Sequence, residues 1–250
     1  MMYRITLLIM ILATFGITSC ANIQKKTEFP IEVRDSFLKV EKFIQAEICQ
    51  DTTCILDQVI GTGSGSVVGA GKFGSLVLTA AHVCETNRYD GNPLVRRVMV
   101  KLEVVDLELK RYDASIILLD RELDTCMLSV VGMKKKPLSI RMGSYEPGTK
   151  VYNVAAPVGI MNYNLVPLLD GYFLGNEGKR ALYSVPAAGG SSGSPIVDAR
   201  GNLVGMVHSV NIRFPMITVS PTLVDLRKFI FEGIRKHQLS LHKKNISGQN

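Results

Sequence analysis

Short apolar segments separated by turn-forming residues run through most of this chain, and they restrict the folds that it can adopt. From Phe37 to Cys49 apolar and polar side chains alternate, which is the period of a half-buried β-strand. Further short strands are expected over 55–60, 66–68, 76–78, 97–106, 112–119, 127–131, 151–155, 163–169, 172–174, 181–185, 196–197, 203–210 and 216–219. Turn residues lie between them, including the glycine-rich stretch 61–65. Many short strands at this spacing predict a sandwich or barrels rather than alternating strands and helices.

One helix is expected near the C-terminus. Ser220, Pro221 and Thr222 supply a cap candidate and a proline for the first turn. The apolar residues that follow at helical spacing are Leu223, Leu226, Phe229, Ile230 and Ile234. We therefore predict a helix over 221–237 and a flexible polar tail over 239–250.

The N-terminus has the composition of an export signal. Arg4 precedes an apolar run over 5–16, which is short for a membrane span, and Ile17-Thr18-Ser19-Cys20 follows. This segment resembles the lipobox of bacterial lipoproteins, which implies cleavage before Cys20 and lipidation of that residue. We expect a signal peptide over 1–19, a tether over 20–34 and a lipoprotein anchored on the periplasmic or extracellular face of a membrane. An ordinary signal peptide or an uncleaved anchor are the alternatives, and both also export the protein.

The other four cysteines suit an oxidising compartment. Cys49 and Cys54 flank a loop of hairpin size, whereas Cys84 lies two residues after His82 and Cys126 lies two residues after Asp124. If His82 and Asp124 meet in the fold, these two thiols are expected to be neighbours as well. We predict the disulfides Cys49–Cys54 and Cys84–Cys126. A metal site is the competing interpretation, but neither a tight CxxC pair nor an HExxH helix is present in the sequence, so no metal and no cofactor are expected.

The net charge of the chain excludes few classes of function. The formal net charge is +7, and the basic residues are scattered except for Lys134-Lys135-Lys136 and the C-terminal end. Such scatter is typical of a solvated surface, and no nucleic-acid partner is expected.

A serine between glycines is the strongest chemical signal. In Gly189-Gly190-Ser191-Ser192-Gly193 the backbone can turn sharply, expose a hydroxyl and direct amide N–H groups at one point. His82 ends one apolar run and Asp124 begins another, so the three groups occur in the order His, Asp, Ser. Two lobes with a cleft between them would bring the three together.

Three motifs around these residues resemble those of the trypsin-like, chymotrypsin-fold serine proteases. The motifs are LTAAHVC, LDTCMLSV and GGSSGSPIVDARGNLVGMV, and a fourth segment, NIRFPMITVSPTLVDLRKFI, is similar to the closing strand and helix of bacterial HtrA-type proteases. The resemblance covers about 35–236. It implies an all-β protease domain over 35–238 with two six-stranded barrels, at about 35–132 and 138–220. The sequence departs from typical HtrA proteases in ending after this helix, so their PDZ domain is not expected.

The resemblance also implies roles for individual residues in an endopeptidase acting on polypeptides. Ser192 would be the nucleophile, His82 the general base and Asp124 the group that orients it, while the N–H groups of Gly190 and Ser192 would form the oxyanion hole. Ser191 precedes the nucleophile where zymogens of this family carry an aspartate, so activation by a newly cut N-terminus is not expected.

The substrate pocket would be walled by Pro186, Ala187 and Ala188 on one side and by His208, Ser209 and Val210 on the other. No charge stands at Pro186, which favours a small or medium apolar residue before the scissile bond. His208 leaves open a glutamyl specificity, as in related glutamyl endopeptidases, although its position lets it lean toward Asp124 instead. The sequence leaves the oligomeric state undetermined.

Three alternatives remain open from the sequence. Asp113 or Asp120 could orient the histidine in place of Asp124. The stretch 189–193 also fits the G-x-S-x-G elbow of an α/β-hydrolase, with Ser191 as nucleophile and Asp225 and His237 as its partners. Finally, the barrels could be catalytically silent and act as a protein-binding module.

Overall fold

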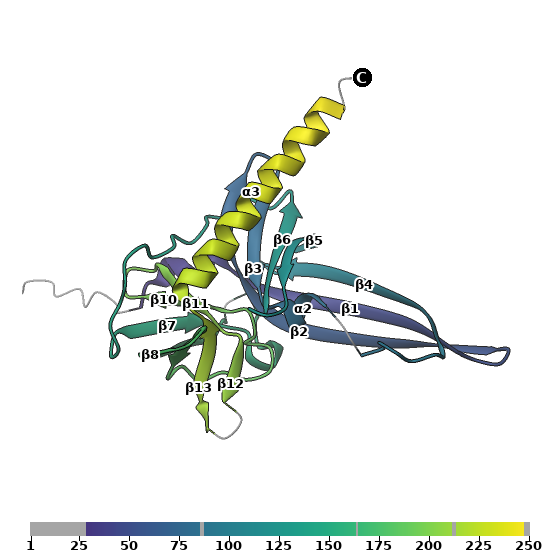
Figure 1. Ribbon diagram of the computed structural model, residues 1–250, viewed down its shortest axis with the longest axis horizontal. Helices are drawn as coiled ribbons and strands as arrows, with labels where there is room; N and C mark the ends of the chain where they lie inside the picture. Colours follow the sequence, from purple (N-terminus) through teal and green to yellow (C-terminus); the bar gives the residue numbers. More distant parts are fainter. Residues whose placement is uncertain (1–28, 86–87, 164, 212–213, 248–250) are drawn as a thin grey trace, which may run out of the picture.

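The computed structural model describes residues 29–247, except 86–87, 164 and 212–213. Its first half is a closed antiparallel barrel with the strand order β1-β2-β3-β6-β5-β4. The strands are β1 (Phe37–Gln50), β2 (Thr53–Gly71), β3 (Gly74–Thr79), β4 (Val95–Val105), β5 (Arg111–Asp120) and β6 (Thr125–Val131). Beyond the barrel, β1, β2 and β4 continue together as a long arm (Figure 1).

The second half is a seven-stranded antiparallel sheet in the order β11-β10-β7-β8-β9-β13-β12. Its strands are β7 (Lys150–Val154), β8 (Leu168–Glu177), β9 (Arg180–Tyr183), β10 (Pro195–Asp198), β11 (Leu203–Met206), β12 (Ser209–Asn211) and β13 (Phe214–Pro221). Since β11 and β12 stand at opposite edges but only two residues apart in the chain, the sheet must curl back on itself. The all-β chymotrypsin-like architecture and a closed six-stranded first barrel are therefore confirmed. The second predicted six-stranded barrel is instead a curled sheet of seven strands.

The glycine-rich stretch 61–65 is not a turn, and the prediction of separate strands over 55–60 and 66–68 is wrong. Both belong to β2, in which Gly63 pairs with Val40 and Gly65 with Leu38 of β1. A Cβ atom at Gly63 would lie 2.7 Å from both methyl groups of Val83. Glycine is needed here because the strand passes directly under the segment that carries the candidate histidine.

Two predicted strands of the second half also need correction. The segment 163–169 is largely irregular, because β8 begins only at Leu168. The segment 203–210 is split into β11 and β12 because its amides change partners: Val207 N donates to Ser194 O (2.9 Å), and His208 N donates to Val219 O (2.9 Å). His208 therefore lies where the chain crosses from one edge of the sheet to the other.

The C-terminal helix α3 spans Leu223–Ser247, so the predicted bounds of 221–237 are wrong. The predicted flexible tail is helical over 239–247, and its last three residues lie outside the described part of the chain. Pro221 ends β13 instead of opening the helix. Thr222 caps it, since its Oγ1 accepts a hydrogen bond from Asp225 N (3.2 Å). The helix packs on β5 and β6 of the first barrel and projects past them (Figure 1).

The described residues also form the short 3-10 helices η1 (Ile31–Ser36) and η2 (Pro157–Gly159). The described part of the predicted tether is docked on the body, because Val33 is buried and the Phe29 ring meets Tyr152 edge-on with 5.3 Å between centroids. The predicted signal peptide over 1–19 and Cys20 lie outside the described residues.

Candidate active site

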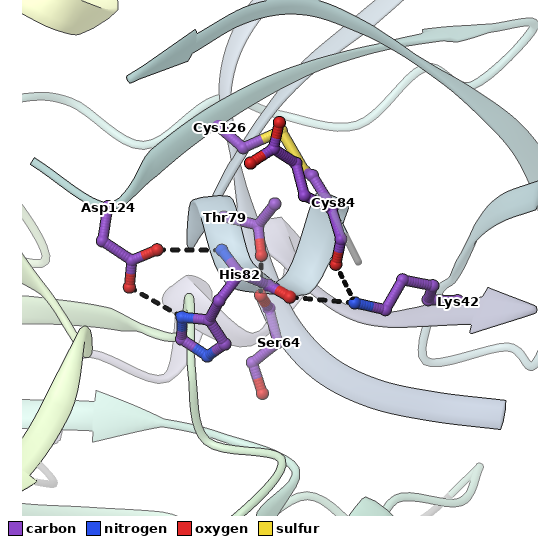
Figure 2. The surroundings of a disulfide bond; sticks show 8 residues. Lys42, Ser64, Thr79, His82, Cys84, Asp124 and Cys126 are labelled. Carbon is purple, nitrogen blue, oxygen red and sulfur yellow. Dashed lines mark hydrogen bonds and ion pairs between the residues drawn. A yellow bond between two sulfur atoms is a disulfide. The ribbon is translucent and has the colours of Figure 1, made fainter. Parts of the chain in front are cut away.

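His82 lies on a single helical turn that leaves the end of β3. This helix, α2 (Ala81–Cys84), is fastened by its backbone, since Ala81 N donates to Asp124 O (3.1 Å). Lys42 of β1 reaches the other end, where its Nζ donates to the carbonyl oxygens of His82 (2.9 Å) and Glu85 (Figure 2). A cation at the carbonyl end of a helical turn satisfies groups that have no partner within the turn. The histidine is thus placed by contacts from two separate strands.

Asp124 faces His82 with both carboxylate oxygens (Figure 2). Oδ1 accepts a hydrogen bond from His82 N (2.8 Å), and Oδ2 lies 2.7 Å from Nδ1 of the ring. Asp124 has a φ of 47°, a left-handed conformation that aspartate tolerates better than most residues. This arrangement holds the imidazole with Nδ1 toward the carboxylate and Nε2 away from it.

The two alternative aspartates are used elsewhere. Asp120 Oδ1 accepts hydrogen bonds from the backbone N–H groups of Glu122 and Leu123, both at 2.9 Å, and so shapes the turn that leads to Asp124. Asp113 is exposed and pairs with Lys101 (3.0 Å). Of the three candidate acids, the structure brings only Asp124 to His82.

Ser192 lies in a turn packed against the strand and the segment that lead to His82. Its carbonyl oxygen accepts a hydrogen bond from Ser64 N (2.8 Å) of β2. The next residue, Gly193, has a φ of 87°, and a Cβ atom there would lie 2.2 Å from Ser64 O and 3.0 Å from Ala80 N. Only glycine allows the serine turn to approach this closely. None of the hydrogen bonds between described residues joins the Ser192 hydroxyl to His82.

The amide groups before Ser192 have a defined orientation. Gly189 O accepts a hydrogen bond from Val158 N (2.6 Å). Because the peptide bond is trans and planar, its N–H, which belongs to Gly190, points the opposite way. Within the described residues, neither Gly190 N nor Ser192 N donates a backbone hydrogen bond in this turn. Among the described residues, no acceptor therefore takes either of these two N–H groups.

His208 brings the second lobe to the same carboxylate. Its Nε2 lies 3.3 Å from Asp124 Oδ2, so Asp124 is flanked by imidazoles from both lobes. Burial lowers the pKa of His208, Asp124 opposes that shift, and His82 and Arg180 add to it. The lean toward Asp124 that the sequence left open is therefore present.

A family model described as a trypsin-like peptidase domain matches residues 63–206, which is 206 − 63 + 1 = 144 of the 250 residues. The chain belongs to the trypsin-like peptidase family.

Solved structures share the fold at low sequence identity. The active form of the Rv3671c protease from M. tuberculosis is 17% identical with a TM-score of 0.57, over 80% of this chain and 81% of that one. An inactive mutant form of Rv3671c is 16% identical with a TM-score of 0.57, over 81% and 88%. A serine endoprotease from Yersinia pestis is 16% identical with a TM-score of 0.59, over 82% of this chain and 65% of that one. No curated protein sequence matches the chain.

Both disulfides are present as paired in the sequence analysis. Cys84–Cys126 ties α2, which carries His82, to β6, which begins directly after Asp124, with 6.6 Å between Cα atoms (Figure 2). Cys49–Cys54 joins facing residues of β1 and β2 at the arm, with 4.1 Å between Cα atoms. Glu47 lies close to Cys49 and Cys54, and three such side chains could in principle bind a metal ion. The sulfur atoms of both cysteines are bonded to each other in the disulfide.

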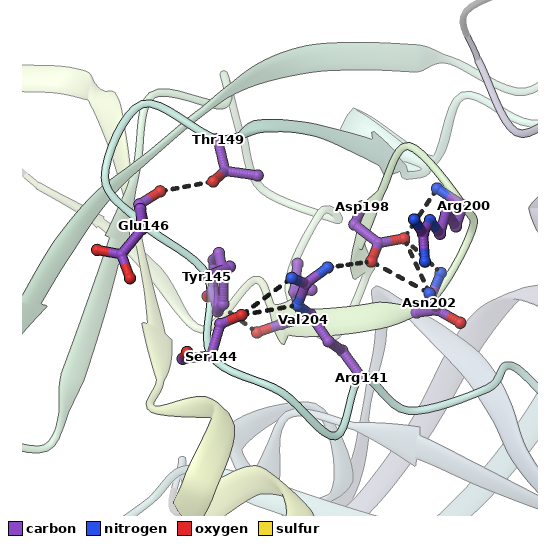
Figure 3. A network of polar contacts seen from close by, with 9 residues as sticks. All are labelled: Arg141, Ser144, Tyr145, Glu146, Thr149, Asp198, Arg200, Asn202 and Val204. Carbon is purple, nitrogen blue, oxygen red and sulfur yellow. Dashed lines mark hydrogen bonds and ion pairs between the residues drawn. The ribbon is translucent and has the colours of Figure 1, made fainter.

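The hairpin after Ser192 is stabilised by Asp198, which the sequence analysis did not select. Its carboxylate accepts hydrogen bonds from Asn202 N (2.9 Å), Arg200 N (2.9 Å) and the Arg141 guanidinium (2.8 Å) (Figure 3). These contacts lower the pKa of Asp198 against the opposing effect of burial. Arg141 also donates to Ser144 O (2.9 Å), so the segment between the lobes is fixed to the hairpin.

The α/β-hydrolase alternative is contradicted. Ser191 is fully buried, and its Oγ accepts from Ala188 N (3.3 Å). Asp225 is bound to the helix cap, where its carboxylate accepts from Thr222 Oγ1 (2.7 Å).

The predicted pocket residues lie next to the serine turn in the chain and at the start of β12. Ala188 and Ser209 are exposed, and Pro186, Ala187 and Val210 are half-buried. Whether they line a substrate pocket stays a prediction.

Proposed function

We propose that this protein is an exported serine endopeptidase that hydrolyses peptide bonds through an acyl-enzyme on Ser192. The observation that carries the proposal is the hydrogen-bonded His82–Asp124 pair beside a serine turn with two free N–H groups. Ser192 Oγ attacks the scissile carbonyl, His82 Nε2 takes its proton and later gives it to the leaving amine, and Asp124 stabilises the charged ring. Gly190 N–H and Ser192 N–H receive the oxyanion.

The missing hydrogen bond between Ser192 and His82 is compatible with this role. Catalytic hydrogen bonds are often long in proteins without substrate and tighten when the substrate binds. The same observation is what a catalytically silent barrel would show, so the labelling experiment below must distinguish the two.

For specificity we propose a small or medium apolar residue before the scissile bond. Pro186, Ala187, Ala188 and Val210 offer no charge to a substrate side chain. His208 is turned toward Asp124, at 3.3 Å, and this contact argues against its use as a receptor for a substrate carboxylate. Cleavage-site profiling on a denatured proteome tests the proposal, and a dominant Glu, Lys or Arg before the cut would refute it.

A fluorophosphonate probe tests the catalytic proposal. It reacts with activated serine hydroxyls, so wild-type protein is expected to be labelled and Ser192→Ala is expected to be unlabelled. Ser191→Ala is the matched control, because it removes the same atom from the neighbouring position. Labelling of wild type that survives Ser192→Ala would place the nucleophile elsewhere, and folded wild type without labelling would favour the binding module.

The membrane anchor is a separate proposal that rests on the segment ending at Cys20. Among the described residues, no helix has the length and hydropathy that a membrane-spanning helix needs. We expect Cys20→Ala to prevent lipid modification and to move the protein out of the detergent phase. Unchanged detergent partitioning of that variant would contradict the lipid anchor.

A further inference from the structure

Ser64 of β2 is a buried serine that connects the first barrel to the serine turn of the second lobe. Its side chain has 0% exposure. Its hydroxyl donates a hydrogen bond to Gly190 O (2.8 Å) and accepts one from Ala156 N (3.0 Å). One hydroxyl therefore uses both its donor and an acceptor position on two segments of the other lobe.

The backbone of Ser64 is held equally firmly. Its N–H donates to Ser192 O (2.8 Å), and its carbonyl oxygen accepts from Thr79 Oγ1 (2.7 Å). Thr79 is the last residue of β3, from which the helical turn carrying His82 follows. Ser64 is thus in contact with both sides of the candidate active site.

The segment that Ser64 holds at Ala156 contains a backbone outlier. Val158 has φ 55° and ψ 23°, a left-handed conformation that is rare for a β-branched residue. Its side chain is 78% exposed, so packing does not explain the conformation. In this conformation the Val158 N–H donates a hydrogen bond to Gly189 O (2.6 Å). Strained residues of this kind concentrate at functional sites.

Gly190 lies between these two contacts. It has a φ of 90°, and a Cβ atom on it would lie 2.5 Å from Ala156 O. Val158 fixes the peptide before Gly190, and Ser64 fixes the carbonyl after it. If the peptide group between Gly189 and Gly190 rotated, the Gly189 carbonyl oxygen instead of the Gly190 N–H would face the position of a developing oxyanion.

We propose that Ser64 is a positioning residue for the oxyanion hole. Its hydroxyl holds the Gly190 carbonyl and the Ala156 amide together, and so keeps Gly190 N–H directed at the oxyanion. This proposal rests on the proposed function, because it requires Ser192 to form a tetrahedral intermediate.

The chain offers a matched control for Ser64→Ala. Ser66 follows two residues later on the same face of β2 and is equally buried, but its Oγ has no hydrogen-bond partner among the described residues. Both substitutions remove one buried hydroxyl from one strand. Only the first removes a contact to the oxyanion-hole turn.

We expect Ser64→Ala to lower kcat for p-nitrophenyl butyrate about 10- to 100-fold, somewhat less than the loss of an oxyanion donor itself. KM is expected to stay within about twofold, since the contact serves the transition state. The rate of fluorophosphonate labelling is expected to fall with kcat. Ser66→Ala is expected to keep all three values near those of the wild type.

The outcomes separate the two proposals. If wild type is labelled and Ser64→Ala matches Ser66→Ala in kcat and labelling rate, the positioning role is overturned and the proposed function stands. If wild type is not labelled, the proposed function fails and the positioning role with it. If Ser64→Ala does not fold, Ser64→Gly and Ser66→Gly replace the pair, since neither variant carries a side chain that can form a hydrogen bond. Equal labelling of these two overturns the positioning role.

Discussion

Asp124 is approached by two histidines, and the two differ in their surroundings. His208 is the more buried, and burial lowers its pKa below the ordinary value of 6.5, with His82 and Arg180 acting in the same direction and Asp124 against it. As pH falls through 6.5 the unfolded chain therefore takes up this proton before the folded one, and stability falls until the pH reaches the folded-state pKa. We predict that the free energy of unfolding, measured by urea denaturation, falls more between pH 8 and pH 5 for wild type than for His208→Gln. The glutamine keeps an N–H donor but does not titrate. The matched control is His242→Gln at an exposed position on α3, and a pH-dependent loss in His208→Gln equal to that of wild type would contradict the prediction.

At the scale of elements, two disulfides of different reach hold different parts of the first barrel. Cys84–Cys126 closes a separation of 42 residues and fastens α2, whereas Cys49–Cys54 closes 5 residues at the arm. Chain entropy predicts a loss of about 4 kcal/mol of unfolding free energy for the double alanine variant of the first pair and about 2 kcal/mol for that of the second. Only the first variant is expected to reduce fluorophosphonate labelling, because only that pair fastens the helical turn that carries His82. Urea denaturation and labelling measure both effects, and reduced labelling in the Cys49–Cys54 variant would count against this assignment.

At the scale of the whole molecule, α3 follows the last strand of the second lobe and packs on the first barrel. One core cluster runs through both lobes and includes Phe229 of this helix, so we expect a single cooperative unfolding transition. Two neighbouring phenylalanines test the helix: Phe229 is 4% exposed and Phe231 is 50% exposed. Phe229→Ala is predicted to lower the free energy of unfolding by about 3–5 kcal/mol, and Phe231→Ala by about 0.5 kcal/mol or less. Calorimetry measures both, and two separate transitions or equal costs would contradict this view of α3.

The sequence by itself determined the strand-rich class, the approximate position of most strands and the order His82, Asp124, Ser192. These follow from alternating hydrophobicity and from local turn chemistry, which act over a few residues. The pairing of cysteines was also within reach, because two of them sit at fixed offsets from residues that were expected to meet.

Only the tertiary structure decided which aspartate faces His82, where the helix ends and that Gly61–Gly65 continues a strand. The sequence analysis also missed four residues that each contact a partner far away in the chain: Lys42, Ser64, Val158 and Asp198. A hydroxyl or an amide carries no local sign of the partner that it will find. The contacts of Lys42 and Val158 form only when distant segments of one lobe pack together, and those of Ser64 form only when the two lobes meet. These contacts give the candidate active site its geometry.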